Sequence, residues 1–358
     1  MKLSVSYLKP GMVLESPVYS DRGKLLLNSN RTLTRSYINA LKKVGVLAVH
    51  IKGIGGLDEA EAEKALSNEV KIDTLTSIQS FVERNMSAKN FQALVLSVQN
   101  IIDEILSGKI ITGGLAEISA YDSYTYSHSV DVCVLSIAIG HQMGLPRATL
   151  VNLGVGGLLH DLGKTRIPLE ILNKPGKLTD DEFDEMKRHS AIGYEMACYE
   201  FEQKLEDETV NIILNHHERF DGSGYPRALK GDELSPLDMI CGAADVYNSM
   251  TTDRVYRKAF PCSEAYEMIL GSGDNYFSMD VVEAFAKSIM PYPLGTLVEM
   301  SDGRRACVVD ANPSLPARPV VKILGTEDLI DLSANLSLVI KSQLSAIDVS
   351  KLAVIRDI

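Results

Sequence analysis

The sequence lacks the features that place a chain outside the cell or inside a membrane. Its cysteines are few, odd in number and without a Cys-x-x-Cys pair: Cys133, Cys198, Cys241, Cys262 and Cys307. We therefore expect a reducing compartment, with no disulfide framework and no cysteine-based zinc site. The chain does not open on a charged segment followed by an apolar one, and no run of about 18 apolar residues is present. A secretory signal and a membrane-spanning helix are not expected, and we predict a cytoplasmic protein.

Positive charge is also scarce. Asp and Glu number 47 against 36 Lys and Arg, which gives a net charge of -11. This balance argues against a broad basic face for duplex nucleic acid. It is still compatible with a small phosphate-bearing ligand, because a metal site or a few placed cations set the charge locally. We find no Walker A loop and no Ser-His-Asp nucleophile elbow, so P-loop chemistry and acyl transfer have no support.

The 358 residues are enough for two or three domains, and the 45% hydrophobic and 23% charged content is that of a globular protein. The patterns predict a mainly α multidomain protein. Its four parts are a small α+β domain (1–52), a charged linker with a solvated helix (53–90), a helical domain (91–290) and a β-rich extension (291–358). The first part carries no catalytic cluster, and we expect it to be regulatory.

Local patterns give the elements. Residues 13–18 and 24–27 flank a polar turn and predict a hairpin, followed by a helix over 36–44. Asp302-Gly303 predicts a second hairpin. Thr179 and Glu182 form a capping box that begins a helix. Apolar residues at helical spacing predict helices over about 91–105, 125–142, 147–161, 180–198, 207–217, 236–250, 263–270 and 279–290.

Histidines and acids concentrate in the helical part. Asp245 lies in an otherwise apolar helix, where burying a lone carboxylate costs several kcal/mol, so a partner such as a divalent cation is expected. Imidazoles and carboxylates together suit Zn, Mn, Fe or Ni. Five histidines and two acids are enough for two metals that share a carboxylate bridge: His128, His160, Asp161, His189, His216, His217 and Asp245. We interpret His50 and His141 as ordinary core or surface histidines.

A loop with two glycines and a proline follows the His216-His217 pair. Glycines let the backbone approach a ligand closely. Tyr225 offers a flat face for a base and a hydroxyl for a phosphate. The loop alone would be an ordinary turn, and its place directly after two candidate ligands is what makes it a candidate substrate contact.

Together these residues resemble the HD-GYP subgroup of the HD superfamily of metal-dependent phosphohydrolases. The resemblance covers about residues 95–290 and implies an all-α HD-type catalytic domain there. Its matching elements are His160-Asp161-Leu162-Gly163-Lys164, His189, His216-His217-Glu218, Gly224-Tyr225-Pro226 and Ala244-Asp245-Val246-Tyr247. Residues 1–52, with Leu8-Lys9-Pro10-Gly11-Met12, also resemble a small domain often found upstream of HD-GYP domains.

The resemblance implies a site of two or three iron or manganese ions that hydrolyses the bacterial messenger cyclic di-GMP to pGpG, and often onward to GMP. It implies that the seven candidates are the ligands, that Asp161 bridges the metals, and that a metal-bridging hydroxide attacks phosphorus. Lys164 would stabilise phosphoryl oxygens or help the leaving group. The implied substrate contacts are Lys164, Gly224, Tyr225, Pro226, Arg254 and Arg257.

Three positions depart from the family pattern. Tyr124 stands where members with three metals carry Glu, so we predict two metals, although Asp122 nearby could supply a weaker ligand. Asn248 stands where Asp is usual, which keeps a carbonyl oxygen but loses a charge and could retune or slow the chemistry. Val255 replaces a usual Pro.

Alternative functions remain open at this point. One is a cyclic-dinucleotide-binding signalling module that is slow or inactive as an enzyme, and another is a 3′3′-cyclic GMP-AMP phosphodiesterase. A third is an HD-superfamily phosphohydrolase acting on nucleoside triphosphates or guanosine alarmones, against which the Gly-Tyr-Pro loop argues. A homodimer or protein partners in signalling are also left open.

Overall fold

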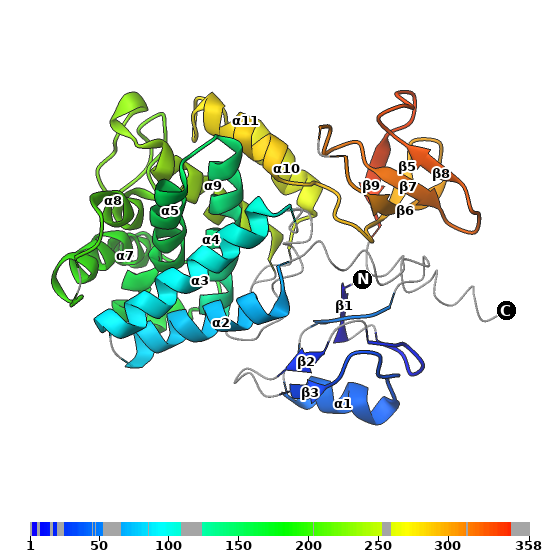
Figure 1. The fold of residues 1–358 in the computed structure, drawn as a ribbon, viewed down its shortest axis with the longest axis horizontal. Coiled ribbons are helices and arrows are strands. Elements are labelled where there is room, and N and C mark those ends of the chain that lie inside the picture. Colours follow the sequence, from blue (N-terminus) through cyan, green and yellow to red (C-terminus); the bar gives the residue numbers. More distant parts are fainter. Residues whose placement is uncertain are drawn as a thin grey trace. The chain divides into compact units, whose positions relative to one another are not determined.

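The computed structural model describes residues 2–344 except 6–7, 15–16, 20–24, 45, 47, 53–65, 85, 109–123, 203, 253–258 and 313. The chain forms two compact units, drawn in Figure 1. One contains Met1–Glu63, Ala116–Tyr124 and Met290–Ile358, and the other contains Lys64–Leu115 and Thr125–Ile289. The mainly α multidomain prediction is confirmed.

The second unit is helical. Its elements are α2 (Asn68–Gln79), the π-helix η3 (Ser80–Arg84), α3 (Ala88–Leu106), α4 (Tyr124–Gln142), α5 (Arg147–Leu159), the 3-10 helix η5 (Leu162–Arg166), α6 (Leu169–Leu172), α7 (Asp180–Tyr199), α8 (Asp207–Asn215), the 3-10 helix η6 (Gly231–Glu233), α9 (Pro236–Thr251), α10 (Cys262–Leu270) and α11 (Met279–Ser288). Helices α4, α5 and α9 are buried on nearly every side, in keeping with their mostly apolar sequences. The predicted capping box of Thr179 and Glu182 begins α7.

The charged segment before residue 90 differs from the solvated helix that we predicted. Helix α2 packs against α3, and Thr74, Ile78 and Phe81 are buried. The Phe81 and Phe91 rings lie 5.9 Å apart. Apolar residues on one side of this segment therefore bind it to the helical unit, while Glu69, Asp73 and Glu83 face solvent.

The N-terminal residues form two small strand pairs and one helix. Strand β1 (Lys2–Ser4) pairs antiparallel with β4 (Ala48–His50), and β2 (Val18–Tyr19) pairs antiparallel with β3 (Leu25–Leu27). Helix α1 (Arg35–Val44) agrees with the predicted helix. The strands of the predicted hairpin do pair, and the residues of its turn lie outside the described residues. This part has a core of its own, which includes Leu14, Leu33, Ile38, Leu41 and Val49.

The C-terminal residues form a five-stranded antiparallel sheet with the order β8-β7-β6-β5-β9. Its strands are β5 (Leu297–Met300), β6 (Arg305–Asp310), β7 (Val320–Ile323), β8 (Leu329–Asp331) and β9 (Ile340–Gln343). The predicted hairpin at Asp302-Gly303 joins β5 to β6, and Gly303 has a φ of 85°, which glycine adopts without strain. Val298, Met300, Val308 and Val321 form its core.

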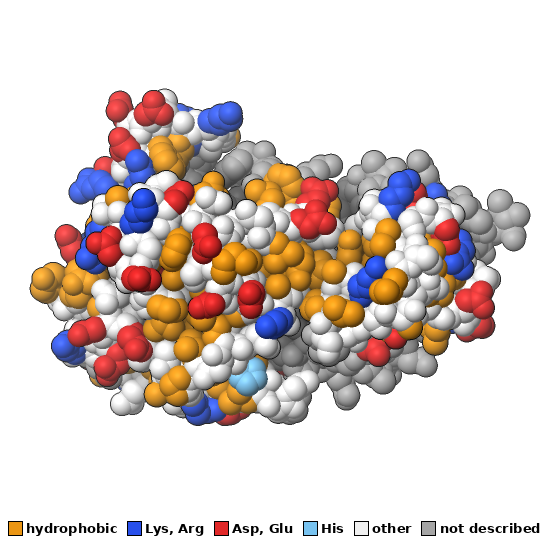
Figure 2. Space-filling view, turned by 90° about the horizontal axis from the view of Figure 1, so that it is seen from above, with side chains coloured by type: hydrophobic (Ala, Val, Ile, Leu, Met, Phe, Trp, Pro, Cys, Tyr) orange, Lys and Arg blue, Asp and Glu red, His pale blue; other side chains and the backbone are white. Residues whose placement is uncertain are grey.

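The surface agrees with the charge balance. On the described part of the face in Figure 2, Lys and Arg side chains alternate with Asp and Glu and form no broad basic area. In the part of the chain that the structure describes, we find no helix of the length and hydrophobicity needed to span a membrane.

Candidate metal centre

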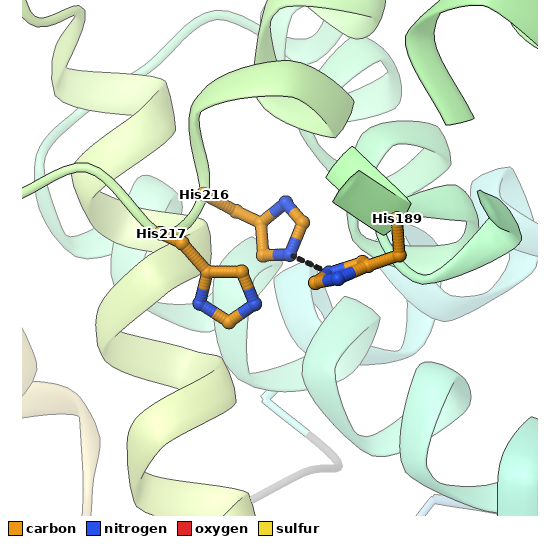
Figure 3. A group of neighbouring side chains, drawn as sticks. All are labelled: His189, His216 and His217. Atoms are coloured by element: carbon orange, nitrogen blue, oxygen red, sulfur yellow. Dashed lines mark hydrogen bonds between the residues drawn. The ribbon is translucent and has the colours of Figure 1, made fainter. Parts of the chain in front are cut away.

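Five helices of the second unit bring the seven candidate ligands together. His128 lies on α4, His189 on α7 and Asp245 on α9, while the two remaining pairs directly follow α5 and α8. Their potential ligand atoms form three groups, each with all atoms within 4.8 Å of one another: His189/His216/His217, His128/His160/Asp245 and His160/Asp161/His216. Figure 3 shows the rings of the first group turned toward a common space.

Three histidines are oriented from within their own helical turn. In each, ring Nδ1 lies at hydrogen-bond distance from the carbonyl oxygen three residues earlier: Gly157 for His160 (2.8 Å), Met186 for His189 (2.7 Å) and Ile213 for His216 (3.0 Å). A carbonyl oxygen only accepts, so Nδ1 must carry the proton. In the neutral form of each ring the lone pair is therefore on Nε2, the atom that faces the centre.

His128 is oriented by a side chain instead. Its Nδ1 lies 2.7 Å from Asn248 Oδ1, and Asn248 Nδ2 donates to Asp131 Oδ2 at 3.1 Å. His128 Nε2 lies 3.1 Å from Asp245 Oδ1. The asparagine that departs from the family pattern thus contacts a candidate ligand directly, and Asp131 was not predicted.

Several buried polar atoms here have no hydrogen-bond partner among the residues that the structure describes. His160 Nε2 and Asp161 Oδ1 are two of them. The Nε2 atoms of His189 and His216 lie 3.4 Å apart (dashed line in Figure 3), with both lone pairs facing the same space. Such atoms cost free energy unless something satisfies them. Divalent cations of the kind that bind imidazole and carboxylate fit this set of donors.

The two acids are held ionised. Burial would raise the pKa of Asp161, but His160 and the Lys164 ammonium outweigh it and hold that pKa well below its usual range. Burial is likewise outweighed at Asp245, where the contact with His128 lowers the pKa most. Asp161 lies near the ring nitrogens of two histidines, 3.4 Å from His160 Nε2 and 3.6 Å from His189 Nε2.

Four of the histidines have a shifted pKa, and in three of them the pKa is lowered, which keeps the ring neutral. Burial lowers the pKa of His217 to about 3 and that of His216 well below its usual range, and it also lowers the pKa of His189. At His160 burial acts in the same direction, but Asp161 outweighs it, and the pKa is raised. A cation that binds His160 would therefore displace a proton there, whereas the other three rings are ready to bind.

Lys164 lies one turn after Asp161, as the spacing predicted. Its Nζ is 2.6 Å from Asp161 Oδ2, and its side chain is 27% exposed. It brings a positive charge that is partly open to solvent to the edge of the centre.

Glu218 holds the Gly-Tyr-Pro loop in place, a role that we did not predict. Its buried carboxylate accepts the backbone N–H groups of Arg227 at 2.5 Å and Leu229 at 3.0 Å. A Cβ on Gly224 would lie 2.4 Å from Glu218 Cα, so only glycine fits there. The loop places Tyr225 over His217, with ring centroids 4.7 Å apart and planes at 27°.

A pocket of about 430 Å³ opens beside the centre. Its walls include His216 and His217 and also aromatic and cationic side chains: Phe183, Lys187, Arg219, Tyr225, Tyr276 and Phe277. The Arg219 guanidinium lies 3.6 Å from the centre of the Tyr276 ring. Phe183, Lys187 and Tyr276 were not predicted as site residues, because only the tertiary structure brings α7 and the loop before α11 to one pocket.

Some predicted residues cannot be compared with the structure. Arg254, Arg257, Val255 and Asp122 lie outside the described residues. Tyr124 begins α4, but its side chain is outside the description. His141 is exposed near the end of α4 and belongs to none of the three groups.

Comparisons with known proteins identify the family. The model of the HD domain matches residues 116–281, and that of the KOW domain associated with the HD domain matches residues 297–352. "Cyclic di-GMP phosphodiesterase PA4108" of Pseudomonas aeruginosa is 32% identical over 357 residues, which cover 90% of this chain and 84% of that protein. The chain belongs to the HD-GYP family.

Other relatives match the helical part. A cyclic di-GMP phosphodiesterase of Thermotoga maritima is 39% identical over 166 residues, covering 46% of this chain and 45% of that protein. Cyclic di-GMP phosphodiesterase PdeB of Borreliella burgdorferi is 31% identical over 202 residues, covering 56% of this chain and 52% of that protein. The chain thus spans about half the length of these two HD-GYP relatives.

A solved structure has the same fold. Bd1817, an HD-GYP-type protein from Bdellovibrio bacteriovorus, aligns with a TM-score of 0.54 at 17% identity, over 80% of this chain and 97% of that one. The helical HD-GYP domain was predicted from the sequence motifs, whereas the segment that the KOW model matches was predicted only as a β-rich extension.

Proposed function

We propose that the protein is a metal-dependent phosphodiesterase that hydrolyses cyclic di-GMP to pGpG, GMP or both. The observation that carries this proposal is the convergence of seven imidazole and carboxylate side chains beside a pocket with aromatic and cationic walls. A cyclic dinucleotide has phosphates that could lie at the imidazole and carboxylate cluster and purine rings that could stack on the walls of the pocket. The names of the relatives over the same residues support this substrate class.

Two divalent ions, iron or manganese, are proposed at this centre. Their ligands would be His128, His160, Asp161, His189, His216, His217 and Asp245, with Asp161 as the bridge. When bound, such ions lower the pKa of a water molecule and neutralise charge on a phosphoryl group. The low pKa of Asp161 and Asp245 supports their role, because a carboxylate binds metal only when ionised.

The remaining contacts follow from charge and shape. In the hydrolysis, water adds across one P–O3′ bond, so that phosphorus gains an oxygen and the departing 3′-oxygen takes a proton. Lys164 would meet the phosphoryl oxygens or the leaving oxygen, because its ammonium lies beside Asp161 and is partly open. Tyr225 would face a base or phosphate, with Gly224 and Pro226 shaping its loop. Arg254 and Arg257 complete the proposed substrate contacts.

A slow or inactive binding module is less well supported. Its motivation was the asparagine at position 248, yet Asn248 accepts a hydrogen bond from His128 as an aspartate would. A 3′3′-cyclic GMP-AMP phosphodiesterase shares the chemistry and one base with the proposed enzyme. We also propose a cytoplasmic location, because none of the five cysteines, all of them described, forms a disulfide.

The proposal is tested on protein purified without oxygen, loaded with Fe(II) or Mn(II) and analysed for metal. Cyclic di-GMP is added and the products are separated by chromatography, with 3′3′-cyclic GMP-AMP in parallel. We expect metal-dependent formation of pGpG or GMP and its loss, together with the loss of metal, in Asp161→Ala.

Asp207→Ala is the matched control, because that carboxylate is 87% exposed. It should keep both metal and turnover. Two metals per chain and saturable nucleotide binding without turnover would instead identify a receptor. Faster turnover of the cyclic GMP-AMP would change the substrate, and unaltered turnover in Asp161→Ala would overturn the assignment of the centre.

A further inference from the structure

His128 differs from the other candidate ligands in how its ring is held. Three of the other histidines donate Nδ1–H to a carbonyl of their own turn, so their orientation needs no other helix. His128 Nδ1 reaches from α4 to Asn248 on α9. An asparagine side chain can present either an oxygen or an NH₂ group to a ring nitrogen, so Asn248 alone would not fix which nitrogen of His128 carries the proton.

Asp131 removes this ambiguity. Its carboxylate only accepts, and it lies 3.1 Å from Asn248 Nδ2, so the amide must present its NH₂ group to Asp131 and its oxygen to His128. The oxygen in turn requires a proton on His128 Nδ1, which makes Nε2 the ring atom that a metal can bind. That atom lies 3.1 Å from Asp245 Oδ1 and 3.8 Å from Asp161 Oδ2.

All three side chains of this chain of hydrogen bonds are buried. The exposed fractions are 1% for Asp131, 4% for Asn248 and 8% for His128. Water therefore competes little for these groups, and in a medium of low polarity each hydrogen bond constrains the next. A buried acid on α4 and an amide on α9 thus act on one ring of the centre.

We propose that Asp131 and Asn248 are a coupled pair of positioning residues, in which Asp131 orients the Asn248 amide and Asn248 sets the tautomer and direction of His128 toward the metals. This inference rests on the proposed metal centre but not on its substrate. The pair also requires opposite chemistry at the two positions. A carboxylate at both would place two anions in contact, and an amide at both would leave the orientation unset.

The test exchanges the two side chains in the full-length protein. Asn248→Asp and Asp131→Asn are made singly and together, and metal affinity is measured by competition with a chelator on the folded proteins. We expect each single variant to bind one of the two metals at least about tenfold more weakly, as is typical when the partner of a ligand is lost. The double variant should recover to within about threefold, because the new amide at position 131 can donate to the new carboxylate at position 248.

The matched control is Asn152→Asp. Asn152 Nδ2 donates to Glu208 Oε2 at 2.9 Å at an exposed site between α5 and α8, so the change again places two carboxylates together, but away from the centre. It should leave metal affinity unchanged. Single variants that lose thermal stability but bind both metals normally would show a merely structural pair. A double variant no better than the weaker single one would show that the two positions are not coupled.

A measurement on the wild-type protein guards against variants that fail to fold. Histidine-selective ¹⁵N NMR of the metal-free protein reports which ring nitrogen carries the proton, and the His128 signal is assigned by its loss in His128→Gln. We expect the proton on Nδ1. An unprotonated Nδ1 would contradict the proposal, whatever the variants do. If the wild-type protein binds metal normally but does not hydrolyse cyclic di-GMP, the proposed function is overturned and this inference still stands.

Discussion

Gly163 lies where the 3-10 helix η5 touches the backbone of α7. A Cβ at this position would be 1.9 Å from the His189 carbonyl oxygen and 2.6 Å from the Gly193 nitrogen. Both neighbours are backbone atoms, so neither can move aside as a side chain would. The glycine of the His-Asp-x-Gly-Lys sequence therefore lets the segment that carries Asp161 approach the helix that carries His189.

We predict that Gly163→Ala destabilises the protein by about 3 kcal/mol or more, at the upper end of the cost of overpacking. It should also weaken metal binding, because η5 must move away from α7. Thermal unfolding and metal analysis check both. The control is Gly271→Ala, where the nearest atom to a new Cβ would be 3.5 Å away. Equal stability of the two variants would contradict this account.

Asp238 is a buried acid that the proposed chemistry does not use. Burial raises its pKa to about 6, although Asn215 donates a hydrogen bond to it at 3.0 Å. The folded state therefore holds a proton that the unfolded state releases near pH 4. Stability from this group is present below about pH 4 and is lost as the pH rises to about 6.

We predict that the difference in unfolding free energy between the wild type and Asp238→Asn falls by about 2 kcal/mol from pH 4 to pH 6, the larger part of the change that the full pKa shift gives at 1.36 kcal/mol per unit. Denaturant titrations at several pH values measure it. Asp280→Asn, at an exposed acid of α11, should show no such trend. A constant difference for Asp238→Asn would be the contrary result.

The candidate ligands could be predicted from the sequence, whereas the residues that orient them and line the pocket could not. Asp245 was recognised because an acid stands out in an apolar helix, and Asp131 on α4 has the same property. It was missed because it matches no motif, and its role depends on a contact between α4 and α9. Phe183, Lys187 and Tyr276 carry no local sign of a pocket, since packing of distant segments makes it.

At the scale of elements, the apolar period predicted the helices closely. The segment expected over 180–198 is α7, Asp180–Tyr199, and that expected over 263–270 is α10, Cys262–Leu270. The pairing of the strands was harder to predict. The pairing of β5 with β9 joins residues 40 or more positions apart, and no turn residue marks it in the sequence.

The capping box of α7 allows a test at this scale. Thr179 Oγ1 accepts from Glu182 N, and Glu182 Oε2 accepts from Thr179 N. We predict that Thr179→Ala lowers stability by about 1 kcal/mol, the usual value of an N-cap, and leaves metal content unchanged. The control is Ser278→Ala, because Ser278 begins α11 without a side-chain hydrogen bond. Thermal unfolding of both variants decides whether the cap stabilises α7.

At the scale of the whole molecule, the helical unit and the C-terminal sheet have separate cores. Val98 on α3 and Val308 on β6 are both fully buried, each among its own neighbours. We predict that Val308→Ala weakens the sheet by about 2 kcal/mol, the scale of a lost buried side chain, without releasing metal. Val98→Ala should lower the temperature at which metal is released. Hydrogen exchange followed by peptide, with metal analysis, distinguishes the two, and metal release in Val308→Ala would show a shared core.

The two ways of holding histidines set an order of disassembly. His160, His189 and His216 are each restrained by a carbonyl only three residues away, so each keeps its direction for as long as its own helical turn survives. His128 keeps its direction only while α4 and α9 stay together. On gentle heating or in mild denaturant, the metal position served by His128 should therefore empty first. The protein would pass through a form with one metal rather than lose both at once.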